Sequence, residues 1–306
     1  MITINNRLEG YIFGSAMGDA LGQPIEFYSL DDIKRIYPPN GIENLPPDSF
    51  WTDDTQMMLA ITKSLIQKND GSIDEIMEVM SKEFVEWINN PGHTPGNTCL
   101  TGAHMLKEGL SWRESGVKES KGCGSVMRSG IIGYFYKNDL NKLIEVASAS
   151  GIATHAHPTA DAACIAGAVI IKLMFDGIHP KDTLPQILDA TKDISDEFDD
   201  AIKLAFELSK SDISTEDAMM QLGEGWIGEE AFAMAMFSVL RNPDNYKKTV
   251  TTAINITGDS DSVGCIAGGI SGAFLGLDAI PKDWIPNLRN SEILDDYITR
   301  LKNVQT

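Results

Sequence analysis

The stretch that decides the fold is GDSDSVGCIAGGISGAFLG at residues 258–276, together with its counterpart GYIFGSAMGDALG at residues 10–22. Residues four apart lie on one face of a helix, so each stretch predicts a helix with a stripe of glycine. The stripes are Gly10, Gly14, Gly18 and Gly22 in one stretch, and Gly264, Gly268, Gly272 and Gly276 in the other. Glycine costs a helix about 1 kcal/mol relative to alanine, so its repeated use needs a packing reason. Close contact between two backbones is such a reason, and we expect both helices to lie deep in the core with the chain's two ends brought together.

Helical periodicity also dominates the rest of the chain. Apolar residues recur at helical spacing through residues 73–87, 158–175, 197–208, 229–240 and 293–301. Strand-like alternation is scarce, and most prolines fall between these segments or at their starts. No shift in composition marks a linker between domains. We therefore predict an all-α fold in a single compact multi-helix domain over residues 1–306, with short connections between helices.

Composition narrows the class of protein. The 306 residues carry 44 acidic and 25 basic side chains, a net charge of −19, which argues against a nucleic-acid partner. No C-x-x-C pair occurs, so we expect reduced thiols and no zinc ribbon. The four cysteines are Cys99, Cys123, Cys164 and Cys265. The first ten residues lack the pattern of a signal peptide, and the longest uncharged stretch, 262–277, is too short for a membrane span. We expect a soluble, cytoplasmic protein without a membrane partner.

Two acidic clusters, WTDDT at residues 51–55 and GDSDS at 258–262, each precede a predicted helix. Aspartate, serine and threonine at such positions are typical helix caps. The same oxygens are the ligands that hard divalent cations prefer, and for the first cluster alone the two interpretations are equally good. An EF-hand is excluded because an apolar helix follows the second cluster directly. The presence of two such clusters favours metal binding over simple capping. If the glycine helices bring four carboxylates together, their mutual repulsion would be costly without cations.

Weaker motifs lie between the two clusters. Glu26 follows GDALGQPI on a predicted loop, where an exposed loop glutamate and a catalytic one are about equally supported. GCGSVMR at residues 122–128 is a glycine-containing loop whose backbone N–H groups could hold a phosphate, although it lacks the Walker lysine and a plain helix start explains it as well. Asn97 follows Pro95-Gly96 and is weak evidence by itself.

Two further motifs carry ring side chains. His155 and His157, in ATHAHP, form an H-x-H pair that is poor evidence for a transition metal and favours structural or ligand-stacking roles. Trp226, in GWIG, is most simply a core residue or a stacking wall for a ring.

Taken together, these pieces resemble the ADP-ribosylglycohydrolase family, which includes the dinitrogenase reductase-activating glycohydrolases. The resemblance spans nearly the whole chain and keeps the family's order of motifs. The matching pieces are GSAMGDALGQPIEF, WTDDTQMMLAI, PGNT, GCGSVMRSGIIG, ATHAHP, GEGWIGEEAFAMAM and GDSDSVGCIAGGISGAFLG.

The resemblance implies an enzyme that hydrolyses the N- or O-glycosidic bond between ADP-ribose and an acceptor, such as a modified protein side chain, in a cleft that holds two divalent cations, Mg²⁺ or Mn²⁺. It implies metal ligands at Thr52, Asp53, Asp54, Asp259, Asp261 and Ser262. It implies catalytic roles for Glu26, Asp53 and Asp261. It places substrate contacts at Asn97, Gly122, Cys123, Gly124, Ser125, Val126, Met127, His155 and Trp226.

Some points stay open at the level of sequence. Many relatives have threonine at the position of Ser262, but serine keeps the hydroxyl. Residues 91–94 lack the acid that some arginine-specific relatives carry, so the linkage that is cut is not fixed. Alternatives are a glycohydrolase or phosphohydrolase acting on a small ADP-ribose or nucleotide conjugate, and a non-catalytic, crystallin-like relative.

Overall fold

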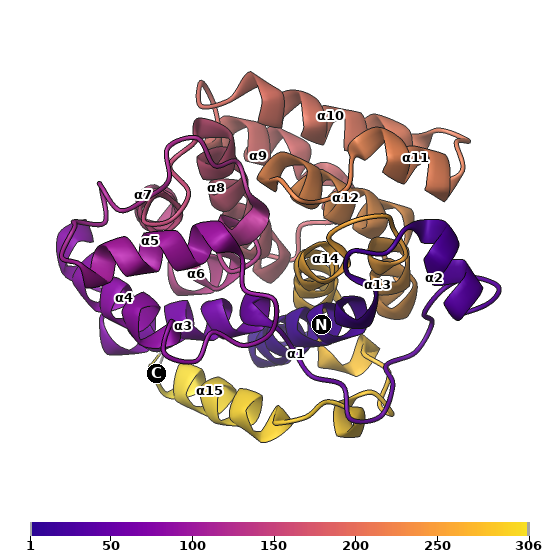
Figure 1. Ribbon diagram of the computed structural model, residues 1–306, viewed down its shortest axis with the longest axis horizontal. Coiled ribbons are helices and arrows are strands. Elements are labelled where there is room, and N and C mark those ends of the chain that lie inside the picture. Colours follow the sequence, from indigo (N-terminus) through magenta and orange to yellow (C-terminus); the bar gives the residue numbers. More distant parts are fainter. Residues whose placement is uncertain (1, 305–306) are drawn as a thin grey trace.

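Two glycine-lined helices form the centre of the computed structural model, which describes residues 2–304 (Figure 1). They are α1 (Ile4–Gly22) and α14 (Ser260–Leu275), and they lie side by side over their full length. A Cβ atom added to Gly14 would fall within 3.0 Å of the carbonyl oxygen of Gly268, and one added to Gly18 would meet Gly264 in the same way. The backbones therefore touch where a side chain would stand, which confirms the packing predicted from the glycine spacing.

Fifteen α-helices and five short 3₁₀ helices make up the described residues. Helix α15 (Ser291–Val304) follows α14 in the chain. The α-helices that come between α1 and α14 in the sequence are α2 (Leu30–Ile36), α3 (Asp53–Gln67), α4 (Ile73–Trp87), α5 (Asn97–Lys107), α6 (Gly130–Phe135), α7 (Leu140–Ile152), α8 (Pro158–Phe175), α9 (Leu184–Ala190), α10 (Asp196–Lys210), α11 (Thr215–Leu222), α12 (Gly228–Arg241) and α13 (Tyr246–Ile254). The 3₁₀ helices are η1 (Gln23–Ile25), η2 (Cys123–Ser125), η3 (Pro180–Asp182), η4 (Leu277–Ala279) and η5 (Ile285–Asn287). Within residues 2–304 there are isolated β-bridges but no strands, so the all-α prediction is confirmed.

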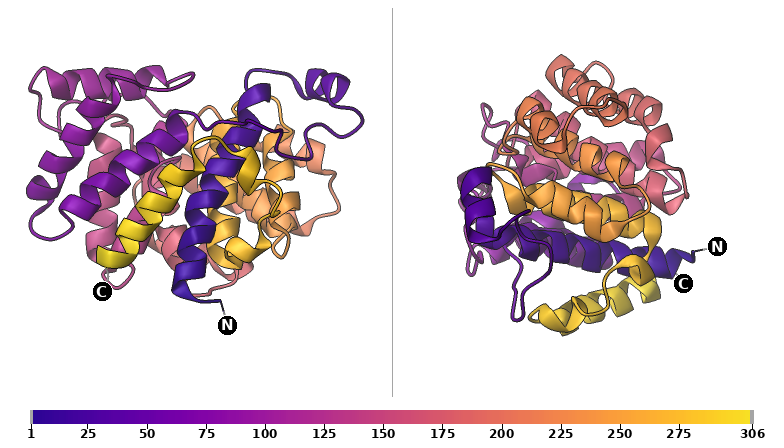
Figure 2. Two further views of the ribbon diagram at one scale, coloured as in Figure 1. Left: turned by 90° about the horizontal axis from the view of Figure 1, so that it is seen from below. Right: turned by 90° about the vertical axis from the view of Figure 1, so that its right-hand side faces the viewer.

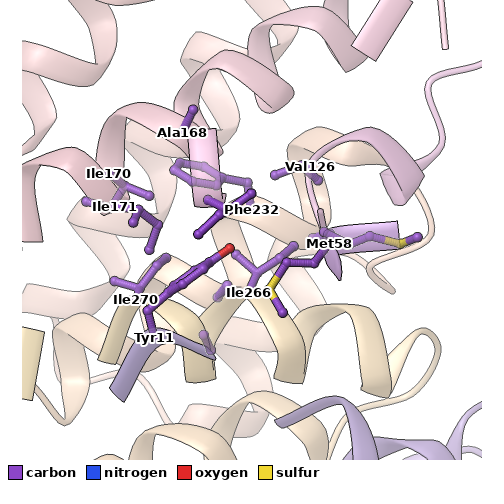
Figure 3. Close-up of a cluster of buried hydrophobic side chains, with 14 of the residues drawn as sticks. Tyr11, Met58, Val126, Ala168, Ile170, Ile171, Phe232, Ile266 and Ile270 are labelled. Carbon is purple, nitrogen blue, oxygen red and sulfur yellow. The ribbon is translucent and has the colours of Figure 1, made fainter. Parts of the chain in front are cut away.

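The other helices pack around the central pair in one compact domain. Helices α8, α12 and α13 contact α14, while α3 and α15 contact α1 (Figure 2). The core between them is apolar: Tyr11 and Ile270 from the central pair meet Ile171 of α8 and Phe232 of α12 (Figure 3). Burial of these side chains supplies the main driving force that holds the helices in place.

Connections are longer than the sequence suggested at two places. Residues 37–52 join α2 to α3, and residues 108–122 join α5 to η2, both largely without regular structure. Pro38, Pro39, Pro46 and Pro47 keep the first segment from forming a helix, because proline lacks the N–H donor and restricts the residue before it. That segment is instead held by a backbone bridge between Ser49 and Leu288.

One helix, α8, is long and apolar enough to cross a membrane by length and composition alone. Within the domain, however, 83% of its apolar stretch is buried against other helices. Its hydrophobicity is thus explained by its place in the core. All four cysteines are buried and free, as the scattered spacing predicted.

Candidate active site

The packing of α1 against α14 brings the two acidic clusters to one cavity of about 310 Å³. Thr52 caps the start of α3 and Asp259 caps the start of α14, so both helices begin at this cavity. The lining combines carboxylates, small polar groups and two aromatic rings. It consists of Glu26, Phe27, Asp53, Asp54, Thr94, Pro95, Gly96, Asn97, Thr98, Cys99, Gly122, Cys123, Gly124, Met127, His155, Trp226, Asp259, Asp261 and Ser262.

The acids from the two clusters lie close to one another. Carboxylate oxygens of Glu26, Asp259 and Asp261 all fall within 4.8 Å of each other. Asp54 is buried beside them, and its Oδ1 atom has no hydrogen-bond partner among the described residues. No lysine or arginine lines the cavity in the described part of the chain. The site is therefore a concentration of negative charge without a protein cation inside it.

Burial and mutual repulsion act on these acids in the same direction. Burial, with the neighbouring acids Asp19 and Asp259 adding to it, raises the pKa of Asp53 to about 8. Burial and then the charges of nearby aspartates raise the pKa values of Asp54 and Asp261 well above their ordinary range. Groups shifted in this way cannot all be ionised near neutral pH unless positive charge enters the cavity.

Asp19 is a buried acid that supports the site and that the motif analysis did not single out. Its buried carboxylate accepts hydrogen bonds from the backbone N–H groups of Thr52 and Thr55 at 3.0 and 3.1 Å, and from the Thr55 hydroxyl at 2.6 Å. It thereby caps the first turn of α3 from the neighbouring helix α1 and fixes the direction of Asp53 and Asp54. The signal was present in the sequence, since an aspartate next to the glycine stripe of a core helix needs a buried partner.

Glu26 stands at the mouth of the cavity, directly after η1. The hydroxyl of Thr94 donates a hydrogen bond to its Oε2 atom at 2.9 Å, which links the loop after η1 to the loop before α5. The second loop is also tied to the acids, because the N–H of Gly96 donates to Oδ2 of Asp53 at 3.2 Å. Burial raises the pKa of Glu26 to about 7.

The starts of two helices, α5 and η2, also line the cavity. Helix α5 begins at Asn97 with no side-chain cap and no acid in its first turn, so the N–H groups of its first residues remain available. The 3₁₀ helix η2 likewise has no side-chain cap, although the N–H of its first residue, Cys123, donates to the carbonyl of Trp226. Gly122 and Gly124 leave room here for His155, whose ring lies against both. Such exposed N–H groups attract anions, phosphates in particular.

Three predicted site residues, two substrate contacts and one metal ligand, do not line the cavity. Ser125 is buried and donates its hydroxyl hydrogen to the carbonyl of Ala160 at 3.1 Å. Val126 lies in the apolar core among side chains of α3, α8 and α12 (Figure 3). Thr52 is buried beneath the cavity, where its hydroxyl contacts Oδ2 of Asp54 at 3.2 Å. The other predicted residues line the cavity itself.

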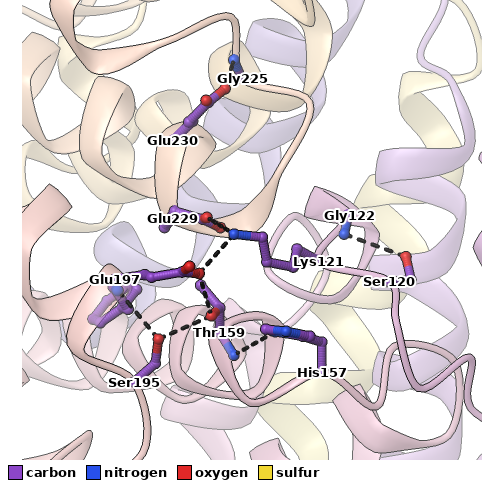
Figure 4. A network of polar contacts seen from close by, with 11 residues as sticks. Ser120, Lys121, Gly122, His157, Thr159, Ser195, Glu197, Gly225, Glu229 and Glu230 are labelled. Atoms are coloured by element: carbon purple, nitrogen blue, oxygen red, sulfur yellow. Dashed lines mark hydrogen bonds and ion pairs between the residues drawn. The ribbon is translucent and has the colours of Figure 1, made fainter.

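The loop that leads into η2 is anchored by Lys121 (Figure 4). Its ammonium group pairs with Glu229 at 3.0 Å and with Glu197 at 2.6 Å. Its carbonyl accepts a 2.7 Å hydrogen bond from the N–H of Gly228, and the N–H of Cys123 donates to the carbonyl of Trp226 at 3.2 Å. Two walls of the cavity, the η2 loop and the loop carrying Trp226, are therefore held as one unit.

Two aromatic rings form the outer rim. Trp226 is 37% exposed and stacks on Phe27, with ring centroids 5.2 Å apart and planes inclined by 20°. Of the two interpretations of Trp226, the core position is therefore wrong and the stacking wall fits. Phe27, which sequence analysis did not single out, has a left-handed backbone with φ of 70° and is 63% exposed. His157 does not join His155 at the site but caps the start of α8.

Comparison with known proteins identifies the family. The model of the ADP-ribosylglycohydrolase family matches residues 1–306. The chain belongs to the ADP-ribosylglycohydrolase family. This confirms the predicted resemblance, and with it the prediction that the protein is an enzyme of the hydrolase class.

Relatives that are named for an activity match most of the chain. The ADP-ribosyl-[dinitrogen reductase] glycohydrolase of Rhodospirillum rubrum is 26% identical and covers 94% of this chain and 91% of its own. The ADP-ribosylarginine hydrolase Tri1 of Serratia proteamaculans is 24% identical, over 97% of this chain and 79% of its own. A solved structure, an ADP-ribosylglycohydrolase-related protein complex, shares the fold with a TM-score of 0.74 at 22% identity, covering 99% of both chains.

Proposed function

We propose that this glycohydrolase cleaves the bond between the anomeric carbon of ADP-ribose and an acceptor, such as an ADP-ribosylated protein side chain, and that it needs two divalent cations, Mg²⁺ or Mn²⁺. The observation that carries the proposal is the meeting of both acidic clusters in one cavity that also presents uncapped helix starts. The family, and the activities for which two relatives are named, support the same substrate class.

The residues of the site fit divalent cations. The donors are carboxylate and hydroxyl oxygens, the ligands that Mg²⁺ and Mn²⁺ prefer. Asp54 has a buried oxygen without a partner, as expected for an atom kept free for an ion. The set that would hold the cations is Thr52, Asp53, Asp54, Asp259, Asp261 and Ser262. When bound, cations would neutralise these acids and act as Lewis acids toward the sugar and water oxygens.

The protein's own groups would orient the substrate. The uncapped starts of α5 and η2 would bind the diphosphate through backbone N–H groups, since the cavity offers no lysine or arginine for this task within the described residues. The rings of Phe27 and Trp226 would hold the adenine by stacking at the rim. The ribose bound to the acceptor would then lie over the acids, with its scissile bond near Glu26.

Glu26 would handle the proton of the reaction. Its carboxylate lies at the mouth of the cavity beside Asp259 and Asp261, and Thr94 fixes its direction. From this position it can accept a proton from the attacking water or return one to the leaving acceptor, which is general acid–base catalysis.

The test is an assay of the purified protein on peptides that carry ADP-ribose on arginine or on serine, with Mg²⁺, with Mn²⁺ and with excess chelator. We expect free ADP-ribose as the product only when a divalent cation is present. Asp261→Asn should abolish turnover, while Asp283→Asn, at an exposed position away from the site, should leave it unchanged. Full activity in chelator would refute the metal requirement, and release of inorganic phosphate in place of ADP-ribose would refute the reaction.

A further inference from the structure

Arg128 is a fully buried arginine without an acidic partner. None of its side chain is exposed, and no carboxylate within the described residues forms an ion pair with it. Its guanidinium lies over the ring of Phe84 at 4.6 Å and its Nε atom has no partner. A buried charge without a counter-ion is costly, so its presence behind the wall of the cavity needs a reason.

A structural reason accounts for part of its contacts. One terminal nitrogen of Arg128 donates to the carbonyl of Ser150 at 2.8 Å, near the end of α7. A positive charge at the end of a helix is favourable, and this contact would satisfy a free carbonyl. The same nitrogen, however, also donates to the hydroxyl oxygen of Thr154 at 2.7 Å, and that hydroxyl leads to the active site.

The chain of donors fixes the proton on His155. Arginine can only donate, so the Thr154 oxygen accepts from Arg128 and its own hydrogen must point elsewhere. The nearest acceptor is Nδ1 of His155 at 2.8 Å, closer than the carbonyl of Gly151 at 3.4 Å. The shorter distance favours Nδ1 as the acceptor, which places the hydrogen of a neutral His155 on Nε2. Burial, with the charge of Arg128 adding to it, lowers the pKa of His155 to about 3, which keeps the ring neutral.

The Nε2 atom is turned toward the substrate-binding wall. It lies beside Gly122 and Gly124, the residues that flank the start of η2, and His155 lines the cavity. No hydrogen bond within residues 2–304 engages Nε2. An N–H donor therefore points at the place where the uncapped backbone of η2 also presents its donors.

We infer that Arg128 and Thr154 act as positioning residues that hold His155 as the neutral Nε2–H tautomer, so that its ring donates a hydrogen bond to the bound ADP-ribose. The identity of the ligand rests on the proposed function, whereas the tautomer does not. Arg128 contributes through Thr154 and His155, without reaching the cavity itself.

The tautomer is measured directly by long-range ¹H–¹⁵N NMR on protein labelled at its five histidines, with His155→Asn used to assign the signals. We expect wild-type His155 to show Nε2–H with a hydrogen-bonded Nδ1, unchanged between about pH 5 and pH 8. Thr154→Val keeps the shape but removes the hydroxyl, so the hydrogen-bonded Nδ1 signal should be lost. Thr154→Ser, which keeps the hydroxyl, should retain it.

Binding of ADP-ribose by calorimetry in Mg²⁺ gives the second measurement. Thr154→Val should weaken binding about tenfold, the effect of one well-placed hydrogen bond, and Thr154→Ser should not. Arg128→Met, where it folds, should populate both tautomers and weaken binding similarly. An Nδ1–H signal in the wild type, or a Thr154→Val protein with unchanged Nδ1 signal and affinity, would overturn the inference. If the wild type binds no ADP-ribose, the proposed function fails, and the NMR signature still decides the positioning role.

Discussion

Replacement of Gly14 by alanine tests the feature on which the whole architecture depends. The added methyl group would fall within 3.0 Å of the backbone carbonyl of Gly268, and backbone cannot rotate away as a side chain does. The two helices must therefore separate by about half an ångström or more, which forfeits roughly a quarter or more of the dispersion energy at their contact. Overpacking of this kind costs about 1–3 kcal/mol, and alanine returns about 1 kcal/mol of helix propensity.

We expect a net loss in the free energy of unfolding at the upper end of this difference, about 2 kcal/mol, because α1 and α14 share the most extensive contact between two elements of the described residues. Urea unfolding followed by circular dichroism measures it. The matched control is Gly151→Ala in α7, where the atoms nearest to the added methyl group belong to the side chain of Cys164, at 3.1 and 3.2 Å, and where we expect a change of less than about 1 kcal/mol. A Gly14→Ala protein as stable as the wild type would refute close backbone packing as the reason for the glycine stripe.

Three further predictions concern the site. Asp19→Asn removes an acceptor of N–H groups at the start of α3, and we expect Mg²⁺ affinity by calorimetry to fall about 10–100-fold, as for other residues that orient metal ligands. Lys121→Met leaves the buried Glu229 unpaired and should cost about 1–3 kcal/mol in urea unfolding, while Lys82→Met, at an exposed pair, should cost less than about 0.5 kcal/mol. The pKa of His155 is about 3 in the folded protein and about 6.5 in the unfolded chain. Its contribution to stability is therefore complete above pH 6.5 and is lost as the pH falls toward 3. The unfolding free energy of the wild type should decline between pH 8 and pH 5, and His155→Asn should remove about 2 kcal/mol of that decline. An equal decline in both proteins would contradict the buried, neutral state of the ring.

Much of the fold could be read from the chain, because its strongest signals are local and periodic. Helices at residues 73–87 and 158–175 have the bounds that the apolar spacing predicted. The meeting of Gly14 and Gly268 followed from a different argument, since only close contact explains repeated glycine in a helix. That contact in turn placed Asp53 and Asp261 at one cavity, although they lie more than two hundred residues apart.

What the sequence could not provide is the direction of individual side chains. Val126 and Met127 are neighbours in one motif, yet one faces the core and the other the cavity, because η2 is a single 3₁₀ turn without a long helical face. Phe27 was overlooked for a related reason. Its left-handed backbone conformation turns the ring outward against Trp226, and an L-residue gives no sign in the sequence that it will adopt such a conformation.

The same architecture explains how so many acids can share one small volume. Asp53 and Asp261 lie in the first turns of two helices, whose positive ends favour negative charge, and Asp259 receives the N–H of Ser262. These contacts offset only part of the cost, as the raised pKa of Asp53 shows. The remaining cost must be offset by bound cations or by protonation of the acids. Rigid packing of α1 on α14 meanwhile prevents the acids from moving apart. Without bound cations the clustered acids therefore lower the stability of the fold, and the glycine stripe is the element that holds them together against their repulsion.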